Sequence, residues 1–276
     1  MTVLVTGATG TVGRQVVGQL LRAGQRVRAL TRNPATAGLP DGVEVVAGDL
    51  TDPASVGPAL AGVTALHLIT FGGDGANPYA PLATGPEIVD LAVRAGVRRI
   101  TVLLGGEPGP LQAAVEASGL EWTLLAPVEF MANLLEWAPS VRSEGVVREA
   151  FAHTRSALVH ETDIGAVAAT VLVGGGYAGR TLTLTGPEAI TRPEKVRTIA
   201  EAIGRDVRYV ELSEAEARAR WAGEGYPAEV VEFFVEVHGN TPEIGYTVVP
   251  TVEQVTGRPA RSFAQWAAEH ADAFRG

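Results

Sequence analysis

The sequence predicts an α/β fold built on a doubly wound parallel sheet with helices on both faces. In the first half of the chain, short apolar runs alternate with segments of helical periodicity, which is the pattern of successive β-α-β units. The apolar runs are nearly continuous, as in strands that are buried on both faces of a parallel sheet. A glycine-rich turn joins the first run to the first helix. These three observations are typical of a Rossmann-type fold.

Six strands and four helices are predicted in the first 130 residues. The first helix is supported by Val16, Val17 and Leu20, which recur on one helical face together with Leu21. The other elements are assigned from the length and periodicity of their apolar runs. The predicted strands are residues 2–6, 26–31, 43–47, 64–70, 99–104 and 122–126, and the predicted helices are residues 13–23, 53–60, 87–95 and 111–118.

After about residue 130 the regular alternation of strands and helices ends, and a smaller α+β set of elements is predicted. Thr162 or Asp163 is expected to cap a helix, and Gly204 to end another. Ser213 and Glu216 have the spacing of a capping box. The predicted helices are residues 131–141, 163–173, 192–203, 214–221 and 263–274, the last with Trp266 facing inward, and the strands are residues 181–185 and 206–212. We therefore expect a domain over residues 1–130 and a small lobe over residues 131–276 that partly returns to it.

The composition excludes several classes of protein. Hydrophobic residues make up 46% of the 276 positions, and the net charge of −9 argues against a binder of nucleic acid or membrane surfaces. The sequence has no cysteine and no histidine pair at i, i+4 spacing, so disulfides, thiolate catalysis and a zinc site are not expected. The longest weakly charged stretch, residues 166–179, is shorter than the roughly 20 residues of a membrane span. Because no basic region precedes the first apolar run, we expect a cytoplasmic protein without a signal peptide.

Residues 6–13, Thr-Gly-Ala-Thr-Gly-Thr-Val-Gly, carry the clearest functional signal. The three glycines lie between the first strand and the first helix, where a bare backbone can approach a pyrophosphate closely. The helix N-terminus adds N–H groups and a partial positive charge. We therefore predict a dinucleotide site here, rather than a turn with a purely structural role. The predicted contacts are Gly7, Thr9, Gly10, Thr11, Val12 and Gly13.

The end of the second strand predicts which dinucleotide binds. An NAD site usually has a carboxylate about 20 residues after the glycines, for the ribose 2′-hydroxyl. This chain has Arg32 instead, and a guanidinium matches a 2′-phosphate. The sequence thus predicts NADP(H), with a plain surface arginine as the alternative; Arg14 adds charge. Asp49, followed by Leu50, is predicted to accept a hydrogen bond from the adenine amino group, with helix capping ahead of Pro53 as the alternative.

These motifs together resemble the NmrA-like group of atypical short-chain dehydrogenases/reductases. The resemblance continues in Val-Arg-Ala-Gly-Val-Arg-Arg-Ile at 93–100, in residues 117–125 and 163–168, in Phe-Met-Ala-Asn at 130–133 and in Thr-Gly-Pro-Glu at 185–188. It therefore covers nearly the whole chain. It implies an NADP-binding Rossmann domain with a small carboxyl-terminal substrate lobe. Members include enzymes like NADPH:quinone reductase and isoflavone reductase, and redox-sensing regulators without known catalysis.

The chain departs from the wider superfamily where a proton donor is expected. The superfamily at large uses a Tyr-x-x-x-Lys pair, in which the lysine lowers the pKa of the tyrosine. The single lysine here, Lys195, has Thr191 four residues before it, so that pair cannot form. Relatives commonly carry small hydroxyl residues after the fifth strand, where this chain has Gly105. They also have an arginine before the proline after the sixth strand, where this chain has Ala126.

Candidate substrate residues follow the carboxyl ends of the strands, where ligands bind in open α/β sheets. Thr70 and Phe71 are predicted beside the cofactor, and the substrate is expected to contact Phe71, Tyr79, Phe130 and Met131. A core or lid role is the alternative for Phe71 and Phe130. Tyr79 and Glu107 are the first candidates for a catalytic acid and Glu129 is a further one, each with a surface position as the alternative.

Hydride transfer to a conjugated carbonyl needs no protein acid, because the nicotinamide carries the chemistry and the protein orients the reactants. The sequence therefore predicts an NADPH-dependent oxidoreductase that reduces a small apolar carbonyl compound such as a quinone or an enone. The alternative is a non-catalytic NADP(H)-binding redox sensor or regulator. The oligomeric state is not predicted.

Overall fold

The computed structural model describes residues 1–72, 80–105 and 109–275, and the predicted Tyr79 and Glu107 lie outside these ranges. The chain forms two compact units. Unit 1 consists of Met1–Pro127, Glu161–Leu184 and Thr251–Arg258. Unit 2 consists of Val128–His160, Thr185–Pro250 and Pro259–Gly276.

Unit 1 contains a seven-stranded sheet in the order β3-β2-β1-β4-β5-β6-β9, with every neighbouring pair parallel. This confirms the predicted doubly wound sheet. Strand order reverses between β1 and β4, which leaves the carboxyl ends of these two strands as the switch point where ligands bind in such folds. The strands are β1 (Thr2–Val5), β2 (Arg26–Thr31), β3 (Val43–Ala47), β4 (Ala65–Ile69), β5 (Arg99–Leu103), β6 (Glu121–Pro127) and β9 (Arg180–Leu184).

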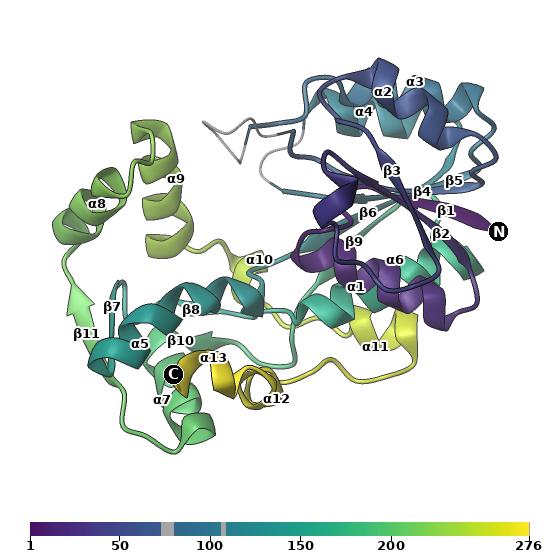
Figure 1. The fold of residues 1–276 in the computed structure, drawn as a ribbon. Coiled ribbons are helices and arrows are strands. Elements are labelled where there is room, and N and C mark those ends of the chain that lie inside the picture. The colour runs from purple at the N-terminus through teal and green to yellow at the C-terminus, as the bar shows by residue number, and fades with distance from the viewer. Residues whose placement is uncertain (73–79, 106–108, 276) are drawn as a thin grey trace. The chain divides into compact units, whose positions relative to one another are not determined.

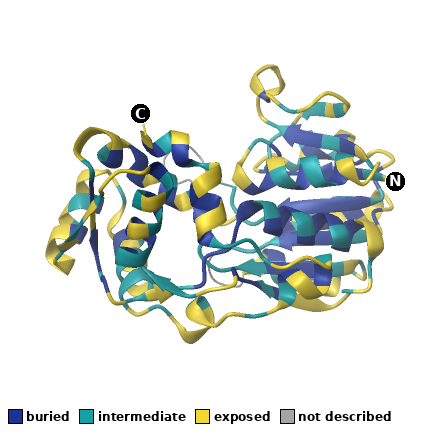
Figure 2. Cartoon of the chain, turned by 90° about the horizontal axis from the view of Figure 1, so that it is seen from below, coloured by how far each residue is buried: buried dark blue, intermediate teal, exposed yellow. Residues whose placement is uncertain are grey.

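Helices cover both faces of this sheet. Figure 1 shows α2, α3 and α4 on one face and α1, α6 and α11 on the other. The helices are α1 (Thr11–Arg22), α2 (Pro53–Val56), α3 (Gly85–Arg94), α4 (Pro110–Ala117), α6 (Glu161–Gly174) and α11 (Thr251–Thr256), with 3₁₀ turns η1 (Pro34–Thr36) and η2 (Gly57–Leu60). Figure 2 shows buried positions concentrated along the strands of the sheet, as expected when both of its faces are covered.

Two local predictions in unit 1 need correction. Residues 53–60 form a short α-helix followed by a 3₁₀ turn rather than one helix. Helix α6 begins at Glu161, so Thr162 and Asp163 lie in its first turn and do not cap it. The Thr162 hydroxyl instead meets Gln15 Oε1 of α1 at 3.1 Å. Gly165 explains this close approach, because a Cβ there would lie 2.6 Å from the Gln15 Cβ.

Unit 2 is a mixed α+β assembly with two small sheets. Strand β7 pairs with β11 in parallel, and β8 pairs with β10 in antiparallel orientation. Its apolar core gathers around Trp266, Phe263 and Phe274, all fully buried, as predicted for Trp266. The elements are η3 (Met131–Trp137), α5 (Ala138–Glu144), β7 (Val146–Ala150), β8 (Arg155–Ser156), β10 (Ile190–Thr191), α7 (Arg192–Ile203), β11 (Arg208–Leu212), α8 (Glu214–Gly223), α9 (Ala228–Gly239), α10 (Glu243–Tyr246), α12 (Phe263–Glu269) and α13 (Ala271–Arg275).

In unit 2 the predicted helix caps are confirmed, but two of the predicted helices are interrupted. Gly204 adopts φ +66° at the end of α7, and Ser213 and Glu216 form the capping box of α8, as predicted. The predicted helix over residues 131–141 is a 3₁₀ segment followed by α5, which has Pro139 in its first turn. The predicted helix over residues 263–274 is interrupted at His270. Within the described residues, no helix is long and apolar enough to cross a membrane.

Candidate functional site

The glycine turn between β1 and α1 is closed by its own backbone. Gly7 has φ +59°, a conformation that favours glycine, and its carbonyl oxygen accepts a hydrogen bond from the Gly10 N–H at 2.9 Å. Gly10 is the N-cap of α1 and carries no side chain to accept from the first turn. No side-chain cap therefore compensates the partial positive charge of the N–H groups at this helix end, which suits an anion.

The glycines of this turn have different surroundings. A Cβ on Gly13 would lie 2.0 Å from the carbonyl oxygen of Gly7, so Gly13 allows the helix to pack onto the turn. Among the described residues, a Cβ on Gly10 would meet only that same oxygen, at 3.2 Å. Gly10 thus leaves a bare surface on the helix N-terminus. The turn fits the pyrophosphate of a dinucleotide, which requires such a close backbone approach.

The end of β4 lies directly beside this turn. The Thr6 hydroxyl donates to the carbonyl oxygen of His67 at 3.0 Å and accepts from the N–H of Ile69 at 3.1 Å. A Cβ on Gly7 would lie 3.0 Å from two carbons of the Ile69 side chain. Burial lowers the pKa of His67 to about 4, so its imidazole is neutral at pH 7, with Nδ1 2.9 Å from the Thr101 hydroxyl. Thr6 and His67 therefore hold the strand ends in place behind the turn.

Arg32 stands exposed just after β2, on the segment that leads to η1. Arg14 holds the far end of that segment, because its guanidinium donates to the carbonyl oxygens of Ala37 at 2.8 Å and Gly38 at 2.6 Å. It also donates to the carbonyl oxygen of Thr9 at 2.8 Å. Arg14 thus links the glycine turn to the Arg32 segment, instead of directing its charge only toward a ligand.

Asp49 follows β3 and forms a turn with Thr51. Its Oδ1 accepts from the Thr51 N–H at 2.9 Å and the Thr51 hydroxyl at 2.8 Å. The hydrogen bond from the Thr51 backbone, with a smaller contribution from the charge of Arg32, lowers the pKa of Asp49. The N-cap of α2 is Asp52, so the alternative that Asp49 caps this helix is wrong. The Leu50 side chain packs in the core.

Thr70 and Phe71 continue from the end of β4. The Thr70 hydroxyl donates to the carbonyl oxygen of Leu103 at 3.2 Å, which ties it to the end of β5. Phe71 is half-buried and forms an isolated bridge with Pro81. Its ring lies against the backbone of Gly105, where an added Cβ would be 2.2 Å from Cε2 and 2.3 Å from Cζ.

The two candidate substrate residues of unit 2, Phe130 and Met131, differ in how far they are buried. Phe130 is half-buried and pairs with Val159 in a short parallel bridge. Met131 is 1% exposed and belongs to the apolar core of unit 2. The burial of Met131 does not favour the predicted contact with a substrate.

Glu129 is held in a buried polar cluster. Its Oε2 accepts from Lys195 Nζ at 2.7 Å and from the hydroxyl of Ser156, while Lys195 Nζ also donates to Ser156 Oγ at 2.8 Å. Burial by itself raises the pKa of Glu129, but the charge and hydrogen bond of Lys195 outweigh it and lower the pKa to about 2. Glu129 is therefore ionised at neutral pH and does not supply a proton. The sequence pointed to the lack of a Tyr-x-x-x-Lys pair but gave no sign of this ion pair.

Comparison with known proteins places this site in a family. Residues 7–107 match a family model described as NAD(P)H-binding. The chain is 39% identical to the (4-alkanoyl-5-oxo-2,5-dihydrofuran-3-yl)methyl phosphate reductase of Streptomyces griseus, with 99% of each chain covered. It is 32% identical to the NAD(P)H azoreductase of Xenophilus azovorans, again with 99% of each covered. The chain belongs to the NmrA-like family of atypical short-chain dehydrogenases/reductases.

A crystal structure supports the same family assignment for this NmrA-like chain. The crystal structure of an NADPH-dependent quinone oxidoreductase of Escherichia coli, complexed with NADPH, is similar with a TM-score of 0.79 and 26% identity. The similarity covers 97% of this chain and 99% of that one. The amino-terminal part of this NmrA-like protein is thus an NAD(P)H-binding domain.

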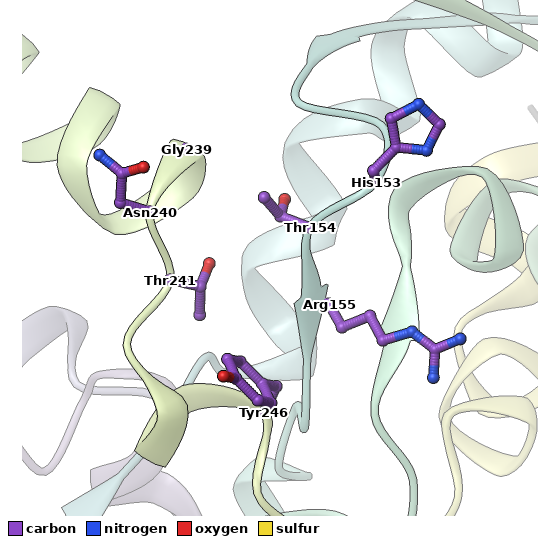
Figure 3. A pocket seen from close by; sticks show the side chains of 7 residues that line it. All are labelled: His153, Thr154, Arg155, Gly239, Asn240, Thr241 and Tyr246. Atoms are coloured by element: carbon purple, nitrogen blue, oxygen red, sulfur yellow. The ribbon is translucent and has the colours of Figure 1, made fainter.

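Unit 2 of the NmrA-like protein also has a surface cavity of about 270 Å³ that no sequence signal predicted. Figure 3 shows Thr154 on one side and Asn240 and Thr241 on the other, while the Arg155 side chain extends away from them. The Thr154 hydroxyl already accepts from Arg192 at 2.6 Å, and the Thr241 hydroxyl donates to the Val237 carbonyl oxygen at 2.8 Å. These polar groups are satisfied by the protein, so the cavity does not identify a ligand. Its lining is His153, Thr154, Arg155, Gly239, Asn240, Thr241 and Tyr246.

Proposed function

We propose that this protein is an NADPH-dependent reductase of a small conjugated carbonyl compound such as a quinone or an enone. The observation that carries the proposal is the bare Gly10 at the N-terminus of α1, in the same unit as Arg32 at the end of β2. A bound nicotinamide supplies a hydride, which is two electrons and one proton. With one further proton from water, the hydride converts a quinone into its hydroquinone.

Residues of unit 1 would hold the cofactor. The pyrophosphate would lie on the backbone of Gly7, Thr9, Gly10, Thr11, Val12 and Gly13, where a helix N-terminus meets a glycine turn. Arg32 would pair with a 2′-phosphate, and Asp49 would accept from the adenine amino group. Thr70 and Phe71 would border the nicotinamide. Leu50 would take part through its backbone, because its side chain is in the core.

The names of the relatives support the acceptor class. One relative reduces an alkanoyl dihydrofuranone carrying a phosphomethyl group, another is an azoreductase, and the solved neighbour is a quinone oxidoreductase. Each named acceptor is a conjugated π system. The pairing of Glu129 with Lys195 also favours an acceptor that needs little help from a protein acid.

Replacing Arg32 with alanine is expected to weaken NADPH binding by roughly 10- to 150-fold, because a charge-assisted hydrogen bond to the 2′-phosphate contributes about 1.5–3 kcal/mol. NADH binding should change little. Fluorescence titration of both dinucleotides measures the ratio. The matched control is Arg26→Ala, at the other end of the same strand, which should leave the ratio unaltered. Equal affinity of the unmodified protein for both cofactors would show that the NADP preference is wrong.

Replacing Tyr79 with phenylalanine, or Glu107 with glutamine, is expected to lower kcat for a quinone by less than about 100-fold. The conjugated oxygens of the acceptor take up the charge of the hydride, so a protein acid adds only part of its usual contribution. Steady-state NADPH oxidation with a quinone tests each variant. A loss of about 10⁴-fold in either would identify a dedicated proton donor.

The second candidate function is a redox sensor that binds NADP(H) without turnover. The burial of the single lysine in an ion pair, away from any Tyr-x-x-x-Lys arrangement, favours it. NADPH oxidation across a panel of quinones and enones separates the two. Turnover supports the reductase, whereas tight NADPH binding with no turnover supports the sensor.

A further inference from the structure

We propose that Arg14 is a positioning residue for the preference for NADPH, because its guanidinium holds the segment that carries Arg32 against the glycine turn. Arg32 is then in place for the 2′-phosphate before the cofactor binds. The inference rests on the proposed NADPH preference and adds to it a residue that acts through Arg32. It concerns unit 1 alone.

The guanidinium of Arg14 joins two stretches of backbone that border the proposed cofactor site. Its Nε donates to the carbonyl oxygen of Thr9, in the glycine turn, at 2.8 Å. Its other two nitrogens bond the segment after β2, where Nη1 donates to the carbonyl oxygen of Gly38 at 2.6 Å and Nη2 to that of Ala37 at 2.8 Å. Because a guanidinium is planar and its donors have a fixed geometry, these three bonds set the distance between the turn and the segment.

The segment that carries Arg32 is exposed and only loosely bonded within itself. Residues 32–36 are exposed, and Ala37 at the far end is buried. The hydrogen bond that closes the 3₁₀ turn η1 joins the Ala37 nitrogen and the Pro34 carbonyl oxygen at 3.3 Å, which is longer than the roughly 2.7–3.2 Å of a good N–H···O bond. The shorter bonds from Arg14 therefore hold the far end of the segment more firmly than its own turn does.

A segment that is fixed in advance binds a ligand more tightly than one that has to be ordered on binding. A 2′-phosphate needs the guanidinium of Arg32 in a defined place, because such charge-assisted bonds depend on geometry. NADH has a hydroxyl at that position and makes no such demand. The glycine turn is closed by its own bond from the Gly10 N–H to the Gly7 carbonyl oxygen, so it should keep its pyrophosphate contacts without Arg14. Arg14 should therefore affect NADPH binding and not NADH binding.

Arg14→Lys tests position against charge, since lysine keeps the positive charge but lacks the planar fork of donors. We expect it to weaken NADPH binding by roughly 2- to 12-fold, the cost of ordering a side chain on binding, and to leave NADH binding unchanged. Fluorescence titration of the full-length protein measures both dissociation constants. Hydrogen exchange of a peptide spanning residues 32–38 should quicken in the cofactor-free variant. The matched control is Arg22→Lys, at the other end of α1, which should change neither measurement.

A double-mutant cycle with Arg32→Ala tests whether Arg14 acts through Arg32. If it does, Arg14→Lys/Arg32→Ala should bind NADPH no more weakly than Arg32→Ala alone. Additive losses would show that Arg14 meets the dinucleotide independently, and would overturn the inference. Full NADPH affinity in Arg14→Lys would overturn it too, since charge alone would then suffice, as would an equal loss of affinity for NADH.

These outcomes are distinct from a failure of the proposed function. If the unmodified protein binds both dinucleotides equally, the NADPH preference is wrong and the inference fails with it. If the unmodified protein prefers NADPH and Arg14→Lys keeps that preference, only the positioning role of Arg14 is wrong.

Discussion

Replacing Gly10 with valine is expected to abolish NADPH binding while the protein remains folded. Gly10 has φ −83° and ψ 178°, an extended conformation that any residue adopts, so the substitution strains no backbone. Within the part of the chain that the structure describes, a Cβ would meet only the Gly7 carbonyl oxygen, at 3.2 Å, which a small shift relieves. The branched side chain then fills the space in which a pyrophosphate must approach the helix N-terminus. Fluorescence titration measures NADPH affinity, and circular dichroism measures the fold.

Gly13→Ala is the matched control and should show the opposite behaviour. Its Cβ would lie 2.0 Å from the Gly7 carbonyl oxygen and 2.6 Å from the carbonyl carbon, which are backbone atoms that cannot rotate away. We expect this variant to lose stability or to fail to fold. A folded Gly10→Val protein that keeps its NADPH affinity would overturn the location of the cofactor site.

This pair of glycines shows how far sequence reasoning reaches. Their spacing between a strand and a helix predicted the turn, because glycine-rich turns at that place have a local backbone requirement. The spacing did not separate their roles. Among the described residues, a Cβ on Gly10 would have one neighbour, whereas a Cβ on Gly13 would overlap the turn, and this difference depends on how α1 folds back onto Gly7. Local signals therefore predicted the glycine turn, and only the packing distinguished the surroundings of the two positions.

Predictions that depended on distant contacts were less successful. Asp49 was open to a capping interpretation until the structure gave that cap to Asp52, three residues later. Met131 follows a strand as a substrate residue would, but it enters the core of unit 2. The contact between the Phe71 ring and Gly105 joins residues 34 positions apart, from the ends of two strands. No periodicity or motif in a single sequence reports such contacts.

Lys195 is the clearest case of a missed interaction. In the sequence, this only lysine of the chain was informative chiefly because no tyrosine lies four residues before it. In the structure, Lys195 pairs with Glu129, which lies 66 residues earlier in the sequence. Lys195 also donates to Ser156, so the cluster joins separate segments of unit 2. The carbonyl oxygen of Glu129 accepts from the Val159 N–H at 2.9 Å, so the same segments are also joined by backbone. The cluster thus fixes the segment that leads to Phe130.

Breaking this ion pair is expected to destabilise the protein by about 3–5 kcal/mol, because the remaining charge stays buried without a partner. Glu129→Gln should cost more than Lys195→Met. The lysine side chain is only 3% exposed and the glutamate side chain is 22% exposed, so the stranded ammonium loses more hydration than the stranded carboxylate. Urea unfolding monitored by circular dichroism gives the free energy of each variant.

The double variant Glu129→Gln/Lys195→Met separates the cost of a stranded charge from the loss of packing. It should recover much of the stability lost in Glu129→Gln, because no unpaired charge remains. The pH dependence gives an independent check. The pKa of Glu129 is lowered from 4.5 to about 2 in the folded protein, so its contribution to stability is complete above pH 4.5 and is lost as the pH falls through about 2. This acid-dependent loss should be absent from the double variant. A double variant as unstable as Glu129→Gln, with the same acid sensitivity as the unmodified protein, would show that the pair does not hold this region through its charges.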